Sequence, residues 1–196
     1  MVREHGKVGR PRSEEARAAV LHAVDDLVVE VGYGGVTLKG IAERAGVSRQ
    51  TIYRWWSTKA EILIEASAVD ARHELDVPAH DHPVEDLAAY LDALIVFLTT
   101  SHAGTAYRAL LGEAQYDEAV GELLRNNDPL GESAAAVIAR SFPGDVLEIP
   151  MSQATALLVG PVFFWILSGR DPQALDSRTL ANDFAQRVAP AHHTST

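Results

Sequence analysis

The sequence predicts an all-α protein in which a small N-terminal three-helix unit precedes a larger helical body. Over most of the chain, apolar residues recur at steps of three and four, the spacing that places them on one face of a helix. Gly and Pro clusters separate these segments, and no stretch alternates apolar and polar residues as a half-buried strand does. We expect about nine helices, with residues 13–57 forming the small unit and residues 58–189 forming the body.

The composition is that of a globular protein without cysteine chemistry. The chain has 196 residues, of which 47% are hydrophobic and 22% charged, and it has no Cys. The absence of Cys excludes disulfides and thiolate metal sites and fits a reducing compartment. The charged N-terminus does not resemble a secretory signal, and the longest apolar run, residues 154–167, is too short to span a bilayer comfortably. We therefore expect a cytoplasmic protein.

The charge is distributed unevenly between the two predicted parts. Residues 1–59 contain ten Lys and Arg against seven Asp and Glu, whereas residues 60–196 contain seven Arg and twenty acids. The net charge of -10 would argue against a nucleic-acid partner if it were spread evenly. A basic N-terminal part on an acidic body instead indicates a small DNA-facing unit, while most of the acids solvate helix surfaces.

Residues 1–12 are expected to be a flexible basic arm followed by the first helix. Arg10 and Arg12 stand just before that helix, where they could reach phosphates or the minor groove, although a basic terminus can also serve solubility alone. Ser13 is a good N-cap, and acids follow it in the first turn. The helix is expected to end at Gly32, and its apolar stripe consists of Val20, Val24, Leu27 and Val31.

Residues 37–59 predict two short helices joined by a tight turn. Thr37 and Ser48 are in N-cap positions, and Gly46 between the helices supplies a left-handed conformation at little cost. Ile52 and Trp56 are spaced to face the core, which leaves the polar residues of the second helix on the opposite side. This arrangement is the helix-turn-helix layout. Thr58 and Glu61 then form a capping box for the next helix.

The exposed side of the second helix carries groups that can contact DNA. Arg49 and Gln50 lie in its N-terminal half and suit guanine and adenine edges respectively. Ser48, Tyr53 and Lys59 are better placed for phosphates, and Thr37 lies at another helix N-terminus that can bind one. In the alternative interpretation, Tyr53 is a core aromatic residue and Lys59 a solvated charge. The predicted DNA-contacting residues are Arg10, Arg12, Thr37, Ser48, Arg49, Gln50, Thr51, Tyr53, Arg54 and Lys59.

The stretch VTLKGIAERAGVSRQTIYRWWSTKAEIL, residues 36–63, resembles the DNA-binding region of TetR-family transcriptional regulators. Gln50 and Trp56 depart from the family pattern, which often has a small residue and Phe there. The resemblance implies backbone phosphate contacts at Thr37, Tyr53 and Lys59. The matching positions are Thr37, Ile41, Ala42, Ala45, Gly46, Val47, Ser48, Thr51, Tyr53, Lys59 and Leu63.

The body is predicted to be helical throughout. A loop is expected at residues 76–83 and another at residues 141–150, because both contain prolines and polar residues. Pro129 interrupts a helical segment and leaves two possibilities open, a kink or a break. Residues 190–196 are expected to be a disordered tail. The expected helices span residues 58–75, 84–100, 104–115, 117–142, 151–168 and 177–188.

One recognition helix covers too few base pairs for tight binding, so a homodimer on a palindromic operator is expected. The helix at residues 151–168 is apolar nearly all round and must be covered on every side, either by a second copy or within one chain. TetR-like regulators pair through their last two helices, which implies a four-helix interface here. The predicted interface residues are Leu157, Pro161, Trp165, Leu180, Phe184 and Val188.

Aromatic residues of the body could line a cavity for an effector, although aromatics at helical spacing also form plain core. The predicted lining residues are Tyr90, Phe97, Tyr107, Leu111, Phe163 and Phe164. The mean hydropathy and the aromatic content favour an apolar or aromatic effector. The resemblance then implies a repressor that this effector releases from its operator.

Two alternatives remain open at this point. The body could respond to a protein partner, or it could be an enzyme tethered to DNA. Against an enzyme, the sequence has no phosphate loop, nucleophile motif or paired catalytic carboxylates, so we expect no catalytic residue and no cofactor. The run His80-Asp81-His82 lacks a third ligand in a fixed register, so we expect a surface loop rather than a metal site.

Overall fold

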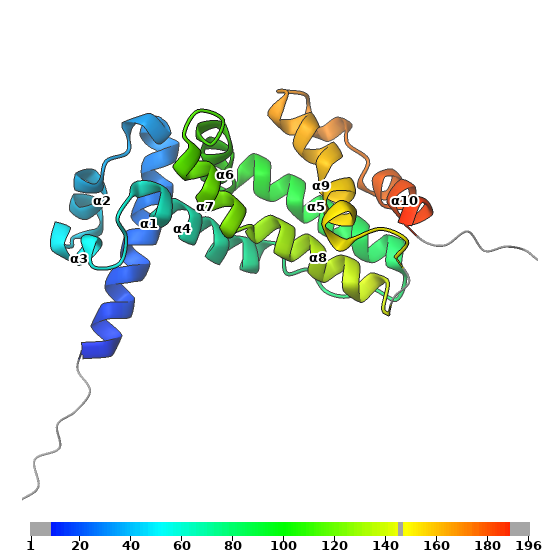
Figure 1. The fold of residues 1–196 in the computed structure, drawn as a ribbon, viewed down its shortest axis with the longest axis horizontal. Coiled ribbons are helices and arrows are strands. Elements are labelled where there is room, and N and C mark those ends of the chain that lie inside the picture. The colour runs from blue at the N-terminus through cyan, green and yellow to red at the C-terminus, as the bar shows by residue number, and fades with distance from the viewer. Residues whose placement is uncertain (1–8, 145–146, 189–196) are drawn as a thin grey trace, which may run out of the picture.

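The structure is a computed structural model that describes residues 9–144 and 147–188 (Figure 1). Within these ranges the chain forms ten α-helices, one short 3-10 helix and no strand. The prediction of an all-α fold is confirmed. The helix number exceeds the expected nine because the segment around Pro129 is broken rather than kinked.

The N-terminal unit consists of α1 (Gly9–Gly35), α2 (Leu38–Ala45) and α3 (Arg49–Tyr53). α1 begins four residues before the predicted start at Ser13, so residues 9–12 are helical and do not belong to a flexible arm. Pro11 is compatible with this earlier start, because its missing N–H falls in the first turn, where it has no intrahelical partner. Gly32 has a φ of 69° and interrupts the regular helix at the predicted position.

The body consists of seven α-helices and the short η1, and α4 (Lys59–Glu74) connects it to the N-terminal unit. Figure 1 shows α1 to α3 at one end of the molecule and α9 with α10 at the other. α4 packs against α1 and against α6 and α8, and α1 also packs against α6. The remaining elements are α5 (Pro83–Thr100), α6 (His102–Glu113), α7 (Glu118–Asn126), α8 (Pro129–Ser141), α9 (Met151–Leu167), η1 (Pro172–Ala174) and α10 (Ser177–Val188).

The break between α7 and α8 lies at residues 127–128. The Asp128 carboxylate accepts a hydrogen bond from the N–H of Gly131 at 2.9 Å and caps α8. Pro129 occupies the first turn of α8, where a missing N–H costs no helical hydrogen bond. The cap and the proline together explain why a new helix begins here.

The body core surrounds α5, which packs against α6, α8, α9 and α10. A buried ion pair fixes α5 to α8. Asp86 of α5 accepts hydrogen bonds from Arg140 Nε at 2.7 Å and Nη2 at 2.9 Å. Burial would raise the pKa of Asp86, but Arg140, the His80 N–H and the Ser141 hydroxyl outweigh this, and the pKa lies below its ordinary value.

None of the helices in the described part of the chain is, by itself, long and apolar enough to cross a membrane.

Candidate functional site

Local side-chain caps and one glycine shape the helix-turn-helix. Thr37 Oγ1 accepts a hydrogen bond from the N–H of Gly40 at 3.0 Å and caps α2. Gly46 ends α2 with a φ of 66°, a left-handed conformation that favours glycine. Ser48 Oγ accepts from the N–H of Thr51 at 3.1 Å and caps α3. The three predicted start and stop signals are confirmed.

The two sides of α3 differ as predicted. Ile52 and Trp56 are buried in the core, whereas Arg49, Gln50 and Arg54 are exposed. The side chain of Tyr53 is 59% exposed, so the interpretation of Tyr53 as a core aromatic residue is wrong. Thr51 is half-buried and its hydroxyl lies 2.9 Å from that of Ser48. The exposed side of α3 therefore presents polar side chains to the solvent.

Among the described residues, the cations that remain without an ion pair in this unit lie on or beside α3. Arg44 of α2 pairs with Glu30 and with Asp26 of α1, and Lys39 pairs with Glu43 at 3.6 Å. Arg49 and Arg54 make no such pair; the Arg54 guanidinium lies 4.6 Å from the centre of the Trp55 ring. Arg10 and Arg12 lie outside the residues whose side chains are described, so their DNA contacts stay predictions.

Lys59 has a structural role that the sequence does not reveal. Its Nζ donates hydrogen bonds to the carbonyl oxygens of Tyr33 at 2.6 Å and Val36 at 3.2 Å, and it lies 4.1 Å from the centre of the Tyr33 ring. Burial lowers the pKa of Lys59. Lys59 is therefore not a freely solvated charge, because it joins the start of α4 to the connection between α1 and α2. The two carbonyl groups occupy two of the three N–H donors of the Lys59 ammonium group. The predicted contact with a phosphate would use the third donor and stays a prediction.

Known proteins carry the same two parts. Residues 20–66 match the family model "Bacterial regulatory proteins, tetR family", and residues 77–188 match "Tetracyclin repressor-like, C-terminal domain". The chain belongs to the TetR family. It is a helix-turn-helix transcriptional regulator that binds DNA, as the resemblance of residues 36–63 predicts.

Similar TetR-family chains extend over most of this one. The HTH-type transcriptional regulator YdeS of Bacillus subtilis (strain 168), itself uncharacterized, is 36% identical over 165 residues, which cover 82% of this chain and 83% of YdeS. Rv2912c of Mycobacterium tuberculosis (strain ATCC 25618 / H37Rv), also uncharacterized, is 30% identical over 68% of this chain and 70% of its own. The crystal structure of the TetR family transcription regulator SCO0332 has a TM-score of 0.71 at 26% identity and covers 90% of this chain and 100% of its own.

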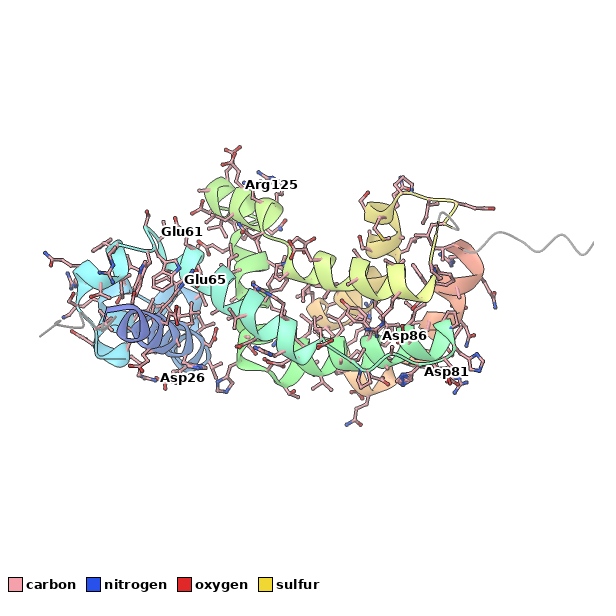
Figure 2. All side chains as sticks on the ribbon, turned by 90° about the horizontal axis from the view of Figure 1, so that it is seen from below. Asp26, Glu61, Glu65, Asp81, Asp86 and Arg125 are labelled. Atoms are coloured by element: carbon pink, nitrogen blue, oxygen red, sulfur yellow. The ribbon has the colours of Figure 1, made fainter. Side chains whose placement is uncertain are left out.

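In this TetR-family chain, a carboxylate of α4 connects two parts of the DNA-binding unit. Glu65 Oε2 accepts a hydrogen bond from Trp56 Nε1 at 2.9 Å, and Glu65 Oε1 lies 2.7 Å from Arg17 Nε of α1 (Figure 2 labels Glu65). Sequence reasoning missed this contact. The available signal was Trp56 itself, because the Phe common at this position in the family has no N–H to donate.

The exposed side of α9 corrects several predictions about the body. Phe164 is 65% exposed and Leu157, Pro161 and Leu167 are exposed too, so Phe164 belongs to an outer apolar face and does not line an internal cavity. Phe184 and Val188 are buried within the chain, but Phe184 lines a small cavity of about 80 Å³ together with Leu157, Pro161 and Leu180, so its contact with a partner stays a prediction.

The i+4 spacing of α10 correctly indicated one apolar side, but that side packs on α5 and α9. Phe184 also packs against Phe142, with ring centres 6.3 Å apart. Leu180 and Trp165 are half-buried, and Trp165 Nε1 donates to the carbonyl oxygen of Asp171 at 2.7 Å. Together with Leu157 and Pro161, these two residues stay predicted interface contacts.

The predicted effector-lining aromatics are mostly core. Tyr90, Phe97 and Tyr107 are buried, and Leu111 and Phe163 are half-buried. The Tyr90 hydroxyl lies 2.9 Å from Ser133 Oγ, and burial raises the pKa of Tyr90 to about 12. Burial of these three residues favours the plain-core alternative, because helical spacing gives the direction of a side chain but not whether space remains beside it; their contact with an effector stays a prediction.

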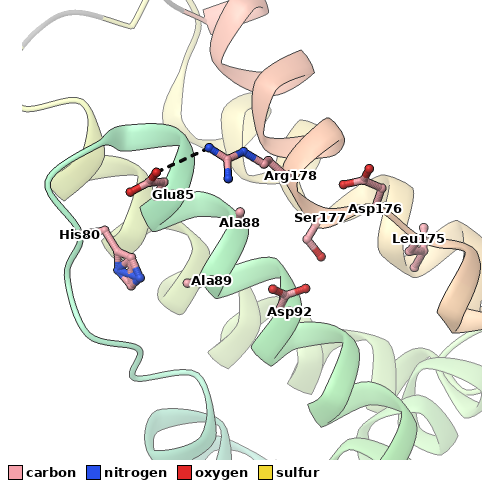
Figure 3. A pocket seen from close by; sticks show the side chains of 9 residues that line it. All are labelled: His80, Glu85, Ala88, Ala89, Asp92, Leu175, Asp176, Ser177 and Arg178. Carbon is pink, nitrogen blue, oxygen red and sulfur yellow. Dashed lines mark ion pairs between the residues drawn. The ribbon is translucent and has the colours of Figure 1, made fainter.

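Three cavities of the body have mixed polar and apolar walls. One of about 610 Å³ lies between α5 and the start of α10 (Figure 3). There Glu85 and Arg178 form an ion pair at 3.5 Å, and Asp92 and Asp176 add two further acids. None of the six predicted effector residues lines this cavity.

Two more cavities lie along α4 and share Arg72. One of about 290 Å³ is lined by residues of α4 and α7 and by Trp56, and another of about 250 Å³ lies between α4 and α8. Ile64 and Leu123 line the first, and Leu75 and Val137 line the second. Sequence reasoning did not single out these residues as a site.

The His80-Asp81-His82 run lies on an exposed loop, where His80 Nδ1 is 3.2 Å from the carbonyl oxygen of Pro78. Within the described residues, no group of three His, Asp or Glu side chains is placed to hold a metal ion.

Proposed function

We propose that this regulator is a dimeric repressor that a small apolar or aromatic effector releases from a palindromic operator. The observation that carries the DNA-reading part is the exposed polar side of α3 opposite the buried Ile52 and Trp56. Arg49 and Gln50, at the start of α3, are in position to read base edges in the major groove. Thr37, Ser48, Tyr53 and Lys59 would contact phosphates and fix the register.

Dimerisation would occur through the exposed apolar face of α9. Phe164, Leu167 and Leu157 are large apolar side chains on one helix with little cover from their own chain. Contiguous exposed apolar residues of this kind mark interaction surfaces. A second copy related by a two-fold axis would bury the same face on both chains and present two recognition helices about 34–36 Å apart, one turn of DNA.

The effector would bind along α4. The two cavities that share Arg72 have mixed walls, and their apolar parts, which include Ile64 and Leu123 in one and Leu75 and Val137 in the other, would receive an apolar or aromatic molecule. α4 also carries Lys59 and Glu65, the residues that hold the DNA-binding unit. A ligand that favours a different position of α4 would change the spacing of the recognition helices and therefore the affinity for the operator.

Titration of the dimer against DNA from upstream of its own gene tests the DNA-reading part. We expect salt-sensitive binding, a strong loss with Tyr53→Ala, and a loss of about 1–3 kcal/mol with relaxed base preference for Arg49→Ala. Tyr116→Ala is the matched control, because Tyr116 is an exposed tyrosine of the body. Equal binding by the Tyr53→Ala and Tyr116→Ala variants would contradict the proposed surface.

The effector part is tested on the wild-type complex with the operator. Small apolar and aromatic compounds are added, and the release of DNA is measured. We expect a releasing compound to lose potency with Val137→Trp, which fills the cavity between α4 and α8, while DNA binding without the compound persists. Release that is unaffected by filling either α4 cavity would exclude this location.

A further inference from the structure

A buried acid lies where the DNA-binding unit meets the body. Asp25 of α1 is 5% exposed, and its Oδ1 has no hydrogen-bond partner among the described residues. Asp70 of α4 is the acid whose charge acts most strongly on it. Both line a small cavity of about 70 Å³ between α1 and α4, whose other walls include Leu21 and Val69. Two carboxyl groups therefore meet across a largely apolar junction.

The charges around Asp25 do not neutralise it. His22 of α1 lines the same cavity. The nearby basic side chains are directed at the neighbouring acid, since Arg44 of α2 and His102 of α6 lie 3.7 and 3.5 Å from the carboxylate of Asp26. On α4, Glu74 accepts a hydrogen bond from the hydroxyl of Ser101.

Two independent effects act on Asp25 in the same direction. Burial disfavours its charged form, and the acids Asp70, Asp26 and Glu74 disfavour it further, which together raise the pKa of Asp25 to about 8. Ionisation of both groups would place the buried charge of Asp25 opposite that of the half-buried Asp70, and the burial of Asp25 limits the screening by water. A proton between them removes one charge and gives the carboxyl pair the hydrogen-bond donor that neither has when both are ionised.

We propose that Asp25 and Asp70 share one proton, and that this proton holds α1 of the DNA-binding unit against α4 of the body. Loss of the proton makes the two carboxylates repel each other and favours separation of α1 from α4. α2 moves with α1, because Arg44 pairs with Glu30. The junction is thus a proton-dependent latch that acts on the recognition helix from a place distinct from the effector cavities.

The first test measures thermal unfolding of the full chain without DNA, from about pH 6 to about pH 9 at constant ionic strength. The pKa of a carboxyl such as that of Asp25 is higher in the folded state than in the unfolded state. Its contribution to the free energy of unfolding is complete when the pH lies below the unfolded-state pKa. This contribution is lost as the pH rises through the folded-state pKa. The melting temperature of the wild type should therefore fall as the pH approaches about 8.

Asp25→Asn tests this assignment, because Asn has nearly the same shape, carries no charge and can donate to Asp70. Its melting temperature should vary less with pH and should exceed that of the wild type at about pH 9. Asp92→Asn, which removes an exposed acid of α5, should follow the wild type. Parallel curves for Asp25→Asn and the wild type would overturn the shared proton.

Asp70→Asn gives an independent reading if Asp25→Asn fails to fold. The amide that this substitution introduces can donate a hydrogen bond to the Asp25 carboxylate, so the ionised form of Asp25 becomes less unfavourable in the folded state. The fall in melting temperature seen in the wild type should therefore occur at lower pH in the variant. If the melting temperature of the variant falls over the same pH range as that of the wild type, the proposal is overturned.

The link to DNA rests on the proposed function and has its own readout. Operator affinity of the wild type should fall with rising pH by at most about tenfold per unit, the limit for one released proton, and Asp25→Asn should remove most of that fall. If both proteins lose affinity equally, the latch does not act on DNA binding. If neither protein binds the operator at any pH, the proposed operator fails, while the unfolding curves still decide whether the proton is shared.

Discussion

The indole Nε1 of Trp56 donates a hydrogen bond to the carboxylate of Glu65 across the boundary between the DNA-binding unit and the body, at 2.9 Å. Trp56 lies three residues after the end of α3, and Glu65 lies on the second turn of α4. The same carboxylate pairs with Arg17 of α1. One side chain of α4 therefore fixes both the first and the last part of the DNA-binding unit.

Trp56→Phe should destabilise the protein without emptying its core. Phe occupies much of the same space but cannot donate, so one oxygen of Glu65 loses its partner at a cost of about 1–3 kcal/mol. Urea unfolding measures the change. Trp55→Phe is the control, because Trp55 Nε1 makes no hydrogen bond within the described residues. An equal loss of stability in both variants would show that ring volume, and not the hydrogen bond, is responsible.

Lys59→Met should separate the two roles of Lys59. Met keeps the apolar stem but leaves the carbonyl groups of Tyr33 and Val36 without their donor, so the free energy of unfolding should drop by about 1–3 kcal/mol. If the remaining N–H also contacts a phosphate, the slope of operator affinity against salt should decrease by about one. A stability loss with an unchanged salt slope would assign Lys59 a purely structural role.

Phe164→Asp should weaken the dimer. Removal of this apolar side chain from an interface and its replacement by a charge should reduce association by about tenfold or more. Sedimentation over a range of protein concentrations measures the change. Val96→Asp provides the matched control, because Val96 is an exposed apolar residue of α5 outside the α9 face. Unaltered association of the Phe164→Asp variant would exclude this face.

Arg140→Leu should leave Asp86 as an unpaired buried acid. The expected loss is about 3 kcal/mol, the low end for a buried pair because Arg140 is partly exposed. Arg178→Leu breaks the exposed pair with Glu85 and should cost less than about 1 kcal/mol.

The pH dependence of the Asp86 contribution has a defined sign. The pKa of Asp86 is lower in the folded state than in the unfolded state. Asp86 therefore stabilises the fold fully when the pH lies above its unfolded-state pKa, near 4, and this stabilisation is lost as the pH falls through the folded-state pKa. Arg140→Leu should remove much of this acid sensitivity, measured by unfolding below about pH 5. A steeper acid loss in the variant would contradict the pairing.

The local features of the DNA-binding unit could be predicted from the sequence. Caps at Thr37 and Ser48 and the turn at Gly46 depend on residues a few positions apart, so their signals are contained in a short stretch. The outward direction of Arg49 and Gln50 followed from the inward direction of Ile52. These predictions needed no knowledge of the rest of the fold.

Long-range packing explains what the sequence could not show. The contacts of Lys59 with Tyr33 and of Glu65 with Arg17 join residues far apart in the chain. The aromatic spacing of Tyr90 and Phe97 predicted burial correctly but could not distinguish a filled core from a cavity wall. Asp25 did leave a signal, since it is an acid three residues before the buried Val28 on the inner side of α1.

The elongated arrangement in Figure 1 has a mechanical consequence for any dimer formed through α9. The pairing helices lie at one end of the molecule, and α3 lies at the other. A small rotation of each subunit about the α9 interface would move α3 through a large distance, because displacement grows with the distance from the rotation axis. The separation of the two α3 helices, which must match the pitch of the double helix, would therefore be the quantity that such a rotation changes most.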